Sequence, residues 1–379
     1  MKLSATRWTG VWVATMLAAG CGRQNEDAAR ESRRIPAWEA VNPIAALPSP
    51  PLGIDSKWTD LPDPPTPARV RLGRWLFFDQ RLSADGTISC ATCHIPERGF
   101  TEPKAVSVGI RGQQLTFPQP DGPAVTRKTP SLINETWPLY PNFFWDGRSS
   151  SLDDLDIRPV ANPQAMGSNH DAMVQTLKTN GYAPYFKEAF GAEEVTKERV
   201  GKAIADYQRT RVSGNSPWDR WKKNRDEGAV SEKVKKGDEL FFGKAGCNQC
   251  HLGNSFADFT FHNLGIGWVA KKRAFNDTGR FNVTKMEADK GAFRTPTLRE
   301  VSLHPPYMHD GSLATLRGVV QLYNKGGNRN PMLDPKIKPL KLTEQEINEL
   351  VAFLEALNGE GYQDVPPSAF PQGAPSNTN

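Results

Sequence analysis

Hydrophobic residues recur at helical spacing in several separate stretches of this 379-residue chain. The clearest case lies near the C-terminal end, where Ile347, Leu350 and Leu354 fall on one face of a helix. Thr343 and Glu346 have the spacing of a capping box, which predicts that this helix begins just after Thr343. Further helices are predicted over residues 68–79, 170–178, 194–212, 230–242 and 314–323. No part of the pattern indicates a strand-rich domain, so the expected fold class is all-α.

Two of the predicted helices are each followed by the same five-residue pattern, Cys-x-x-Cys-His. The copies are Cys90-Ala91-Thr92-Cys93-His94 and Cys247-Asn248-Gln249-Cys250-His251. In this pattern the two cysteines bond to the vinyl groups of one haem, and the histidine becomes a ligand of its iron. Two zinc half-sites or two disulfides are the alternative, but neither gives the histidines a role. We therefore expect two covalently bound c-type haems.

The repeated order of helix, haem motif and loops predicts two mainly helical haem domains. We place the N-terminal domain at residues 68–220 and the C-terminal domain at 221–362. Residues 22–67 are rich in Pro and Ala and are expected to form a tether and a lead-in that wraps the first domain. Residues 363–379 are expected to be a polar tail.

The first 21 residues have the features of an export signal. Lys2 and Arg7 precede an apolar run that is too short to span a membrane. The run ends in Leu17-Ala18-Ala19-Gly20-Cys21, which is similar to a bacterial lipobox, although the leucine stands one place early. Ordinary cleavage that leaves Cys21 as a free thiol is the alternative. We expect a periplasmic protein that is anchored to a membrane by a lipid on Cys21, which would account for the fifth cysteine.

The amino-acid composition argues against one class of partner, nucleic acid. The net charge of +5 is small for this length, and no basic run is interleaved with aromatic residues, so nucleic-acid binding is not expected. A hydrophobic content of 38% and a charged content of 23% are ordinary for a soluble globular protein. The 31 prolines and 32 glycines fit small haem domains, because the cofactor replaces part of the core and loops wrap its edge.

Three further motifs accompany the two haem motifs. They are Phe144-Trp145-Asp146-Gly147-Arg148, Thr295-Pro296-Thr297-Leu298-Arg299 and Pro306-Tyr307-Met308-His309-Asp310-Gly311-Ser312. From residue 68 to residue 359, the order of these five motifs resembles the bacterial di-haem cytochrome c peroxidases. The resemblance implies two cytochrome c-like domains, with an N-terminal haem that reacts with peroxide and a C-terminal haem that passes electrons. It also implies a protein electron donor or a protein substrate.

Two positions concern the link between the haems and the ligand of the second haem, and the second of them makes the chain similar to the MauG-like branch of that family. The family's tryptophan between the haems matches Trp145, whose indole can be oxidised, although core packing is the usual role of tryptophan. The sixth ligand of the second haem is a methionine in ordinary members, and that position here is Tyr323. A phenolate ligand favours ferric iron and lowers the reduction potential relative to methionine. Met308 and Met332 are the alternative ligands if Tyr323 only packs on its helix.

Three residues that the family carries near the first haem are replaced in this chain. Ile110 stands at the place of a displaceable histidine, so the resemblance implies a haem that is open without reductive activation. Leu155 stands at the place of a glutamine, and Ala165 at the place of a glutamate that moves the peroxide proton. Proton transfer of this kind is worth roughly 10²–10⁴-fold in rate. Asp156, Gln164 or a water is a candidate substitute, although Asp156 is expected to be a solvated helix residue.

The resemblance also concerns calcium and the haem propionates. Ordinary members hold Ca²⁺ between the haems through an asparagine side chain, two backbone carbonyls and waters, and Lys128 occupies the asparagine position. The matching carbonyls belong to His304 and Pro306. Calcium is therefore doubtful, since it needs oxygen ligands, and we hypothesise that the Lys128 ammonium replaces it. The alternative is that Lys128 points outward and Ca²⁺ keeps water there. Arg148 and Arg294 are candidate partners of haem propionates.

These observations predict an exported di-haem c-type peroxidase-like oxidoreductase. It would use hydrogen peroxide at the N-terminal haem and pass oxidising equivalents through Trp145 to the C-terminal haem, where a partner protein is oxidised. The alternative is a degenerate electron carrier or a haem-based sensor without peroxidase turnover. An apolar pocket of Ile110, Leu155 and Ala165 would suit that alternative, because it favours a neutral diatomic ligand.

Overall fold

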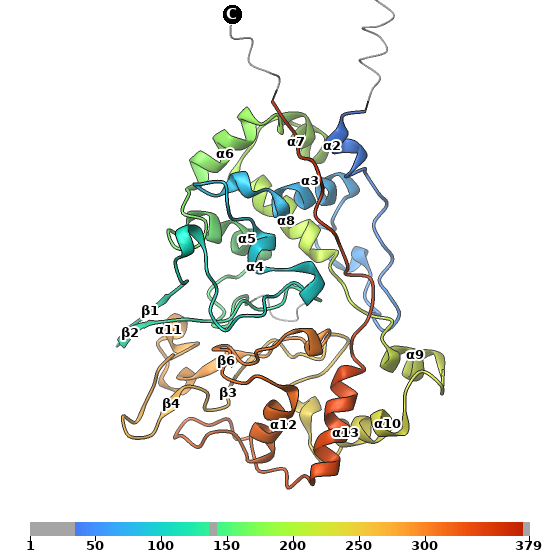
Figure 1. The fold of residues 1–379 in the computed structure, drawn as a ribbon, viewed down its shortest axis with the longest axis vertical. Helices are drawn as coiled ribbons and strands as arrows, with labels where there is room; N and C mark the ends of the chain where they lie inside the picture. The colour runs from blue at the N-terminus through green and yellow to red at the C-terminus, as the bar shows by residue number, and fades with distance from the viewer. Residues whose placement is uncertain (1–34, 121, 136–141, 374–379) are drawn as a thin grey trace, which may run out of the picture.

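The structure is a computed structural model that describes residues 35–120, 122–135 and 142–373. Two helical halves are stacked along the long axis of the molecule (Figure 1). The predicted export signal, the lipobox residue Cys21 and the last six residues lie outside the described residues. Within the described ranges, no helix combines the length and the apolar character that crossing a bilayer requires.

The N-terminal half is a group of helices around one hydrophobic core. At its centre α3 (Pro67–Phe78) packs on α8 (Lys197–Arg209). The two helices meet at Gly73, where an added Cβ atom would lie 1.8 Å from the backbone oxygen of Ala203, so the crossing requires glycine. The other helices of this half are α2 (Ala37–Ala40), α4 (Cys90–Cys93), α5 (Leu152–Ala161), α6 (His170–Thr179) and α7 (Ala183–Phe190).

The C-terminal half repeats this arrangement around a second core. Here α10 (Glu232–Phe242) packs on α13 (Glu344–Glu355), which begins with the predicted capping box at Thr343. The crossing again requires glycine, because a Cβ atom on Gly237 would lie 2.1 Å from the backbone oxygen of Glu349. The other helices are α9 (Pro217–Asn224), α11 (Phe281–Thr284) and α12 (Leu316–Asn324). In both halves, the helix before the haem motif packs on the helix that ends the half.

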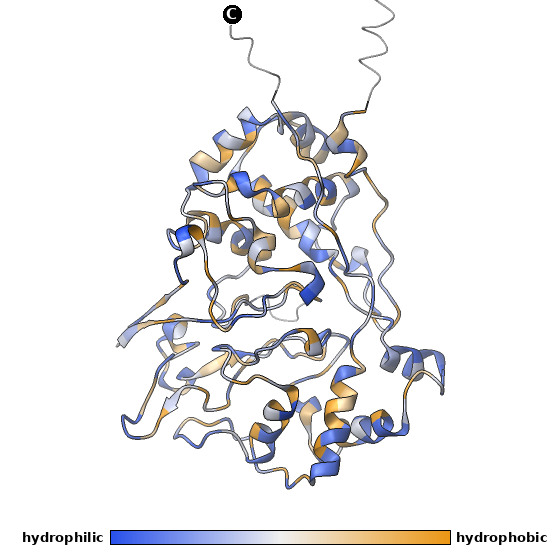
Figure 2. Cartoon of the chain, viewed as in Figure 1, coloured by the Kyte–Doolittle hydropathy of each residue, from blue (hydrophilic) through white to orange (hydrophobic). Residues whose placement is uncertain are grey.

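Strands are short and occur only as antiparallel pairs in the described part of the chain. The pairs are β1 (Phe117–Gln119) with β2 (Gly122–Val125), β3 (Phe261–Asn263) with β6 (Ala292–Arg294), and β4 (Trp268–Val269) with β5 (Ala274–Phe275). Short 3₁₀ turns are Trp58–Asp60, Gln80–Leu82, Pro96–Arg98, Ile110–Gly112, Cys247–Gln249, Glu287–Asp289 and Val301–Leu303. The fold is mostly helical, as expected, and Figure 2 shows apolar and polar residues on the same helices, as is usual for amphipathic helices.

Buried ion pairs fix the two halves to one another. The guanidinium of Arg127 donates to Asp277 at 2.7 Å and to Asp146 at 2.6 Å. Arg294 of the C-terminal half likewise pairs with Glu135 of the N-terminal half at 2.8 Å, and both side chains are buried. Removal of one member of such a pair would leave a buried charge without a partner, which costs several kcal/mol. The relative position of the halves is therefore strongly determined.

Residues 363–373, the start of the predicted polar tail, return along the N-terminal half (Figure 1). The carboxylate of Asp364 accepts hydrogen bonds from Arg74 at 2.9 Å and from Tyr207 at 2.8 Å. Arg211 approaches the same carboxylate at 3.2 Å. The chain end is thus held against the core of the other half, a contact that its polar composition did not predict.

Candidate functional site

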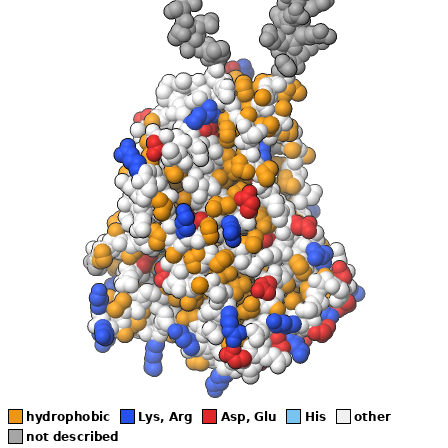
Figure 3. Space-filling model, in the orientation of Figure 1, with side chains coloured by type: hydrophobic (Ala, Val, Ile, Leu, Met, Phe, Trp, Pro, Cys, Tyr) orange, Lys and Arg blue, Asp and Glu red, His pale blue; other side chains and the backbone are white. Residues whose placement is uncertain are grey.

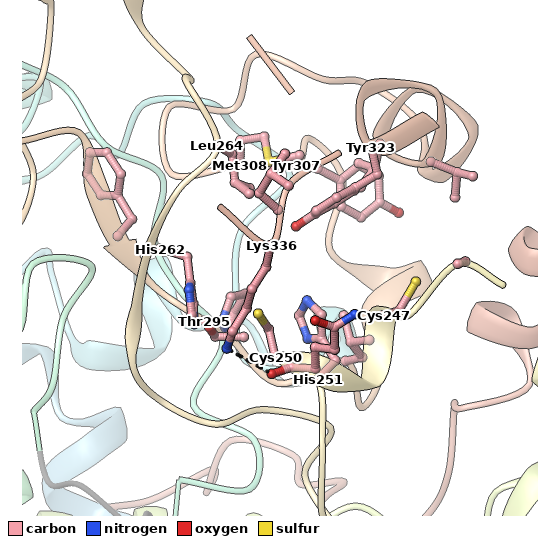
Figure 4. Close-up of a pocket in the computed structure, with 18 of the residues that line it drawn as sticks. Cys247, Cys250, His251, His262, Leu264, Thr295, Tyr307, Met308, Tyr323 and Lys336 are labelled. Carbon is pink, nitrogen blue, oxygen red and sulfur yellow. Dashed lines mark hydrogen bonds between the residues drawn. The ribbon is translucent and has the colours of Figure 1, made fainter. Parts of the chain in front are cut away.

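A cavity of about 210 Å³ lies in the C-terminal half. The second haem motif forms one wall through Cys247, Cys250 and His251, and α12 contributes Tyr323 (Figure 4). Most other lining side chains are apolar, among them Phe241, Ile266, Leu316, Val320, Leu350 and Leu354. An apolar cavity with two thiols and an imidazole in its wall suits a large apolar cofactor that is attached by thioethers.

The two motif histidines are oriented in the same way. His251 Nδ1 lies 2.8 Å from the backbone oxygen of Phe256, and His94 Nδ1 lies 3.0 Å from that of Phe100. Since a carbonyl oxygen only accepts, each Nδ1 must donate its proton, and the lone pair is then on Nε2. Burial lowers the pKa of both histidines, so both rings are neutral. Neutral imidazoles held by Nδ1 are prepared to bind iron through Nε2.

The four motif cysteines are not bridged to one another. Burial raises the pKa of the Cys90 and Cys247 thiols to about 12, and neutral thiols are poor ligands for zinc. The only cluster of three metal-binding side chains among the described residues is Cys250, Asp258 and His262, which includes neither motif histidine. The arrangement therefore fits haem better than the zinc or disulfide alternatives.

Tyr323 extends into the C-terminal cavity from α12 (Figure 4). Burial raises its pKa, so the side chain is a neutral phenol here. Met308 also borders this cavity, whereas the described residue Met332 is not part of its lining. The lining of the cavity therefore leaves Tyr323 and Met308 as alternative ligands for the second haem and disfavours Met332.

His262 is held between two carboxylates beside the same cavity. Its Nδ1 donates to Asp334 at 2.6 Å and its Nε2 donates to Asp258 at 2.9 Å. Burial opposes a charge on this ring, but the hydrogen bond to Asp258 and the one to Asp334 raise the pKa of His262 to about 10. The ring is therefore an imidazolium at neutral pH. No sequence pattern indicates that Asp334 is bonded to His262, because the two residues lie 72 positions apart.

In the N-terminal half, two of the three replaced residues lie together. The amide of Ile110 donates to the backbone oxygen of Ala165 at 2.8 Å, and both side chains are buried. Leu155 packs instead with Phe143 and Leu152, and it borders a second cavity of about 40 Å³. All three positions are apolar, as expected, but the structure joins only Ile110 and Ala165 directly.

Asp156 is buried, and the expectation that it is a solvated helix residue was wrong. Only 7% of its surface is exposed, and its Oδ2 has no hydrogen-bond partner. Burial raises the pKa of this carboxyl well above its ordinary value, and the group in turn raises the pKa of Cys90. Gln164 is different, since its side chain is already bonded to Thr116. Asp156 is therefore the better of the two candidate proton donors.

Trp145 borders both the C-terminal cavity and the second cavity. Its indole Nε1 donates to the backbone oxygen of Lys128 at 2.8 Å, and its ring lies 6.5 Å from that of His309 in an edge-to-face arrangement. The backbone oxygen of Trp145 accepts from the amide of Arg294 at 2.9 Å. The indole thus has a fixed orientation between the two halves.

The two arginines proposed for haem propionates are bonded to protein carboxylates. Arg294 makes a bidentate pair with Glu135, with both distances 2.8 Å, while its Nε is buried and has no partner. Arg148 donates to Asp146 at 2.9 Å and lies over the ring of Phe144. The Nε of Arg294 is the donor that remains for a propionate, which fits a haem in this region.

Lys128 is buried and does not point outward. Its side chain donates to the backbone oxygen of Glu102, and only 5% of the residue is exposed. Burial lowers the pKa of Lys128 to about 8, although the Glu102 carboxylate acts in the opposite direction. The nearby ammonium also contributes, after burial, to lowering the pKa of His304 to about 3. A cation therefore occupies the position that the resemblance assigns to an asparagine ligand.

Some polar groups at the site have no signal in the sequence. Gln208 of α8 is 2% exposed, borders the second cavity beside Leu155, and its Oε1 has no partner. The Arg127 pair with Asp277 and the Arg294 pair with Glu135 span 150 and 159 positions. Separations of this size leave no periodic pattern, so only the folded chain reveals these groups.

Comparison with known proteins agrees with the geometry. The family description "Di-haem cytochrome c peroxidase" matches residues 67–227. The methylamine utilization protein MauG of Methylorubrum extorquens is 42% identical over 302 residues, which cover 79% of this chain and 80% of the relative. The cytochrome c551 peroxidase of Nitrosomonas europaea is 34% identical over 314 residues, which cover 82% and 84%.

A solved structure is also similar to the fold. It is a MauG-like protein associated with microbial copper homeostasis, with a TM-score of 0.72 and 29% sequence identity. The match covers 85% of this chain and 96% of that chain. Matches of this extent include residues of both helical halves.

Proposed function

The chain belongs to the di-haem cytochrome c peroxidase family, and we propose that it is an exported oxidoreductase of the MauG-like branch. It would reduce hydrogen peroxide with two electrons and two protons to give two molecules of water. Both electrons would come from a partner protein that is oxidised at the C-terminal half. The observation that supports this proposal is the position of Trp145, which borders the cavity of the second haem motif and donates a hydrogen bond to Lys128 of the N-terminal half. One relative is itself named as a peroxidase of cytochrome c551, which supports a protein as the electron donor.

The residues that would hold the two haems belong to the two motifs and to α12. Each haem, when bound, supplies an iron that exchanges single electrons, and the N-terminal one supplies the binding face for peroxide. For the first haem the residues are Cys90, Cys93 and His94, and for the second they are Cys247, Cys250, His251 and Tyr323. The neutral motif histidines bind through Nε2, and the Tyr323 phenol must release its proton when its oxygen becomes a ligand.

Trp145 would carry electrons between the halves. Its hydrogen bond to Lys128 fixes the indole plane, and the ion pairs of Arg127 prevent the two halves from separating. An indole beside the cavity of the second haem motif would shorten the last step of an electron that travels to that motif.

Asp156 would handle the peroxide proton in place of the polar residues that Leu155 and Ala165 replace. Because its pKa is raised by burial, the carboxyl is protonated and holds a proton at neutral pH. Its unpartnered Oδ2 lies on α5, one position after Leu155, and the carboxyl lies near enough to Cys90 of the first haem motif to affect the pKa of that thiol when ionised. A buried carboxyl with a raised pKa is the usual form of a general acid.

Lys128 would supply the positive charge that calcium supplies in ordinary members. Its ammonium is buried against Glu102 and lies one hydrogen bond from Trp145 through its own carbonyl. Metal analysis of the purified holoprotein tests this part: a preparation without bound calcium is expected, and one tightly held Ca²⁺ per chain would contradict it.

A second candidate is an electron carrier or haem-based sensor without turnover, favoured by the buried apolar side chains of Ile110 and Ala165. Hydrogen peroxide added to the diferric holoprotein, without a donor, distinguishes the two. The peroxidase proposal predicts a rapid change in the absorbance of both haems and consumption of the peroxide. An unchanged spectrum would favour the carrier or sensor.

A further inference from the structure

The loop between α12 and α13 carries a group of exposed cations. Its single acidic residue, Asp334, is turned inward and accepts a hydrogen bond from His262. None of the cations has a carboxylate within salt-bridge distance in the described part of the chain. They are Lys325, Arg329, Lys336, Lys338 and Lys341, hereafter the basic rim. Because the Asp334 carboxylate is mostly buried and bonded to His262, the loop presents five basic side chains to solvent and no acidic one.

The basic rim is part of the wall of the C-terminal cavity. Lys336 and Lys338 both line this cavity, together with Tyr323. Figure 4 shows Lys336 extending towards Cys250 and His251, where its Nζ donates to the backbone oxygen of Gln249 at 3.3 Å. Two of the five cations of the basic rim therefore border the cavity that the second haem motif lines.

An exposed apolar side chain directly follows the second haem motif in the sequence. Leu252 directly follows His251 and is 45% exposed, although leucine is ordinarily buried. A small apolar contact surrounded by charges is typical of surfaces at which proteins associate transiently. Such surfaces bring two redox centres together for a short time and then release the partner.

The basic rim lies at one end of the molecule and the first described helix lies at the other. In Figure 1, α2 and residue 373 are at the upper end, and α12 and α13 are at the lower end. Figure 3 shows Lys and Arg side chains concentrated along this lower end. The charges of the rim therefore suit a partner with an acidic surface, and the proposed transfer of electrons to a protein favours a protein over a lipid surface.

We propose that the basic rim is the docking surface for an acidic protein, whose redox centre is thereby placed over the C-terminal cavity. This inference rests on the proposed function, because it names the class of partner that exchanges electrons there. Complementary charges raise association rates from about 10⁵–10⁶ M⁻¹s⁻¹ towards 10⁸–10⁹ M⁻¹s⁻¹ at low salt. Association should therefore weaken steeply as the ionic strength rises.

Reduction of the diferric holoprotein by two donors of opposite charge tests the proposal. The anionic probe is a reduced acidic [2Fe–2S] ferredoxin, which gives one electron to a ferric haem, and the cationic probe is the methyl viologen radical. The test variant is Lys336→Glu/Lys338→Glu. The control is Lys271→Glu/Lys272→Glu, which makes the same change in charge on the exposed turn between β4 and β5. Stopped-flow absorbance at about 10 mM salt, where the Debye length is about 30 Å, gives each rate constant.

The test variant should lower the ferredoxin rate constant at least about tenfold and raise the viologen rate constant, while the control changes the ferredoxin rate at most about twofold. Equal losses in test and control, or no loss in either, would overturn the proposal. If the test variant does not load haem, Arg329→Glu/Lys341→Glu replaces it, because neither residue lines the cavity.

Two further measurements separate the possible failures. Vesicles of phosphatidylglycerol that bind the wild type but not the rim variant, with an unchanged ferredoxin rate, would identify a membrane surface and overturn the acidic-protein proposal. The reaction of the wild-type holoprotein with peroxide, measured without any donor, reports on the proposed function alone. If that reaction fails, the proposed function is contradicted, while the ferredoxin rates still show whether the basic rim binds an acidic protein.

Discussion

The indole nitrogen of Trp145 donates a 2.8 Å hydrogen bond to the backbone oxygen of Lys128. The amide of the same Lys128 donates to the backbone oxygen of His309 at 2.7 Å. One residue therefore links the indole to the C-terminal half, while its ammonium is buried against Glu102. The hydrogen bond uses the backbone oxygen of Lys128, so the side chains of Trp145 and Lys128 can be substituted independently.

Trp145→Phe should slow peroxidase turnover at least about tenfold, which corresponds to about 1.4 kcal/mol in the barrier. Phenylalanine keeps an aromatic ring in place but is much harder to oxidise, and it cannot donate to Lys128. The reaction of peroxide with the protein in the absence of a donor should keep its initial rate. Trp268→Phe, in β4, is the control. Equal turnover in Trp145→Phe and wild type would exclude an electron path through the indole.

Tyr323→Phe should change the absorbance of the second haem, because the phenyl ring offers no oxygen to the iron. Tyr323→Met should raise the reduction potential of that haem, since methionine is a softer and neutral ligand. Tyr307→Phe is a matched control, because Tyr307 lines the same cavity. The measurement is spectroelectrochemical titration of each holoprotein. A second-haem spectrum that is unaffected in Tyr323→Phe would assign the ligand to Met308 instead.

Asp156→Asn should lower the rate of the peroxide reaction by about 10²-fold or more, the ordinary contribution of a positioned general acid. Asparagine has almost the same shape but cannot give up a proton. Asp156→Ala should raise the thermal stability of the holoprotein, because it removes a buried group without a partner. Asp154→Asn on the exposed face of α5 is the control for both measurements. A normal peroxide rate in Asp156→Asn would mean that water, and not Asp156, donates the proton.

Lys128 should give the stability of the protein a distinctive pH dependence. Its pKa is lowered in the folded state, so between about pH 8 and the ordinary value of 10.5 the unfolded state binds more protons. The stability of the wild type relative to Lys128→Met should therefore rise with pH across this window, by at most about 3 kcal/mol. Below about pH 8 the difference should be constant.

Thermal unfolding of both holoproteins at a series of pH values checks this expectation. Lys104→Met, which removes an exposed lysine from the same loop region, is the comparison variant. A difference between wild type and Lys128→Met that falls as the pH rises would mean that the ammonium is stabilised, not strained, by its buried position.

The sequence was sufficient for the repeating parts of the fold. Helical periodicity located α3, α8, α10 and α13 to within a few residues, and the capping box at Thr343 forms as its spacing predicts. The two haem motifs likewise needed no structure, because their chemistry lies within five consecutive residues. These features are local, so the local sequence determines them.

The sequence was not sufficient for contacts between distant residues. Asp156 follows two other acidic residues in a helix, a pattern typical of a solvated face, yet packing of α5 on α8 buries it. The pairing of Asp334 with His262 turns an apparent surface acid into an internal one. In each case tertiary packing overrides the local pattern.

The return of residues 363–373 along the first core has a mechanical consequence. Asp364 is fastened to Arg74, Tyr207 and Arg211, which belong to the opposite half of the molecule. Residues 363–373 therefore tie the C-terminal half to the N-terminal half, and these contacts would have to break before the two halves could move apart. A protease that trims this segment should loosen the spacing of the two metal centres without touching either one.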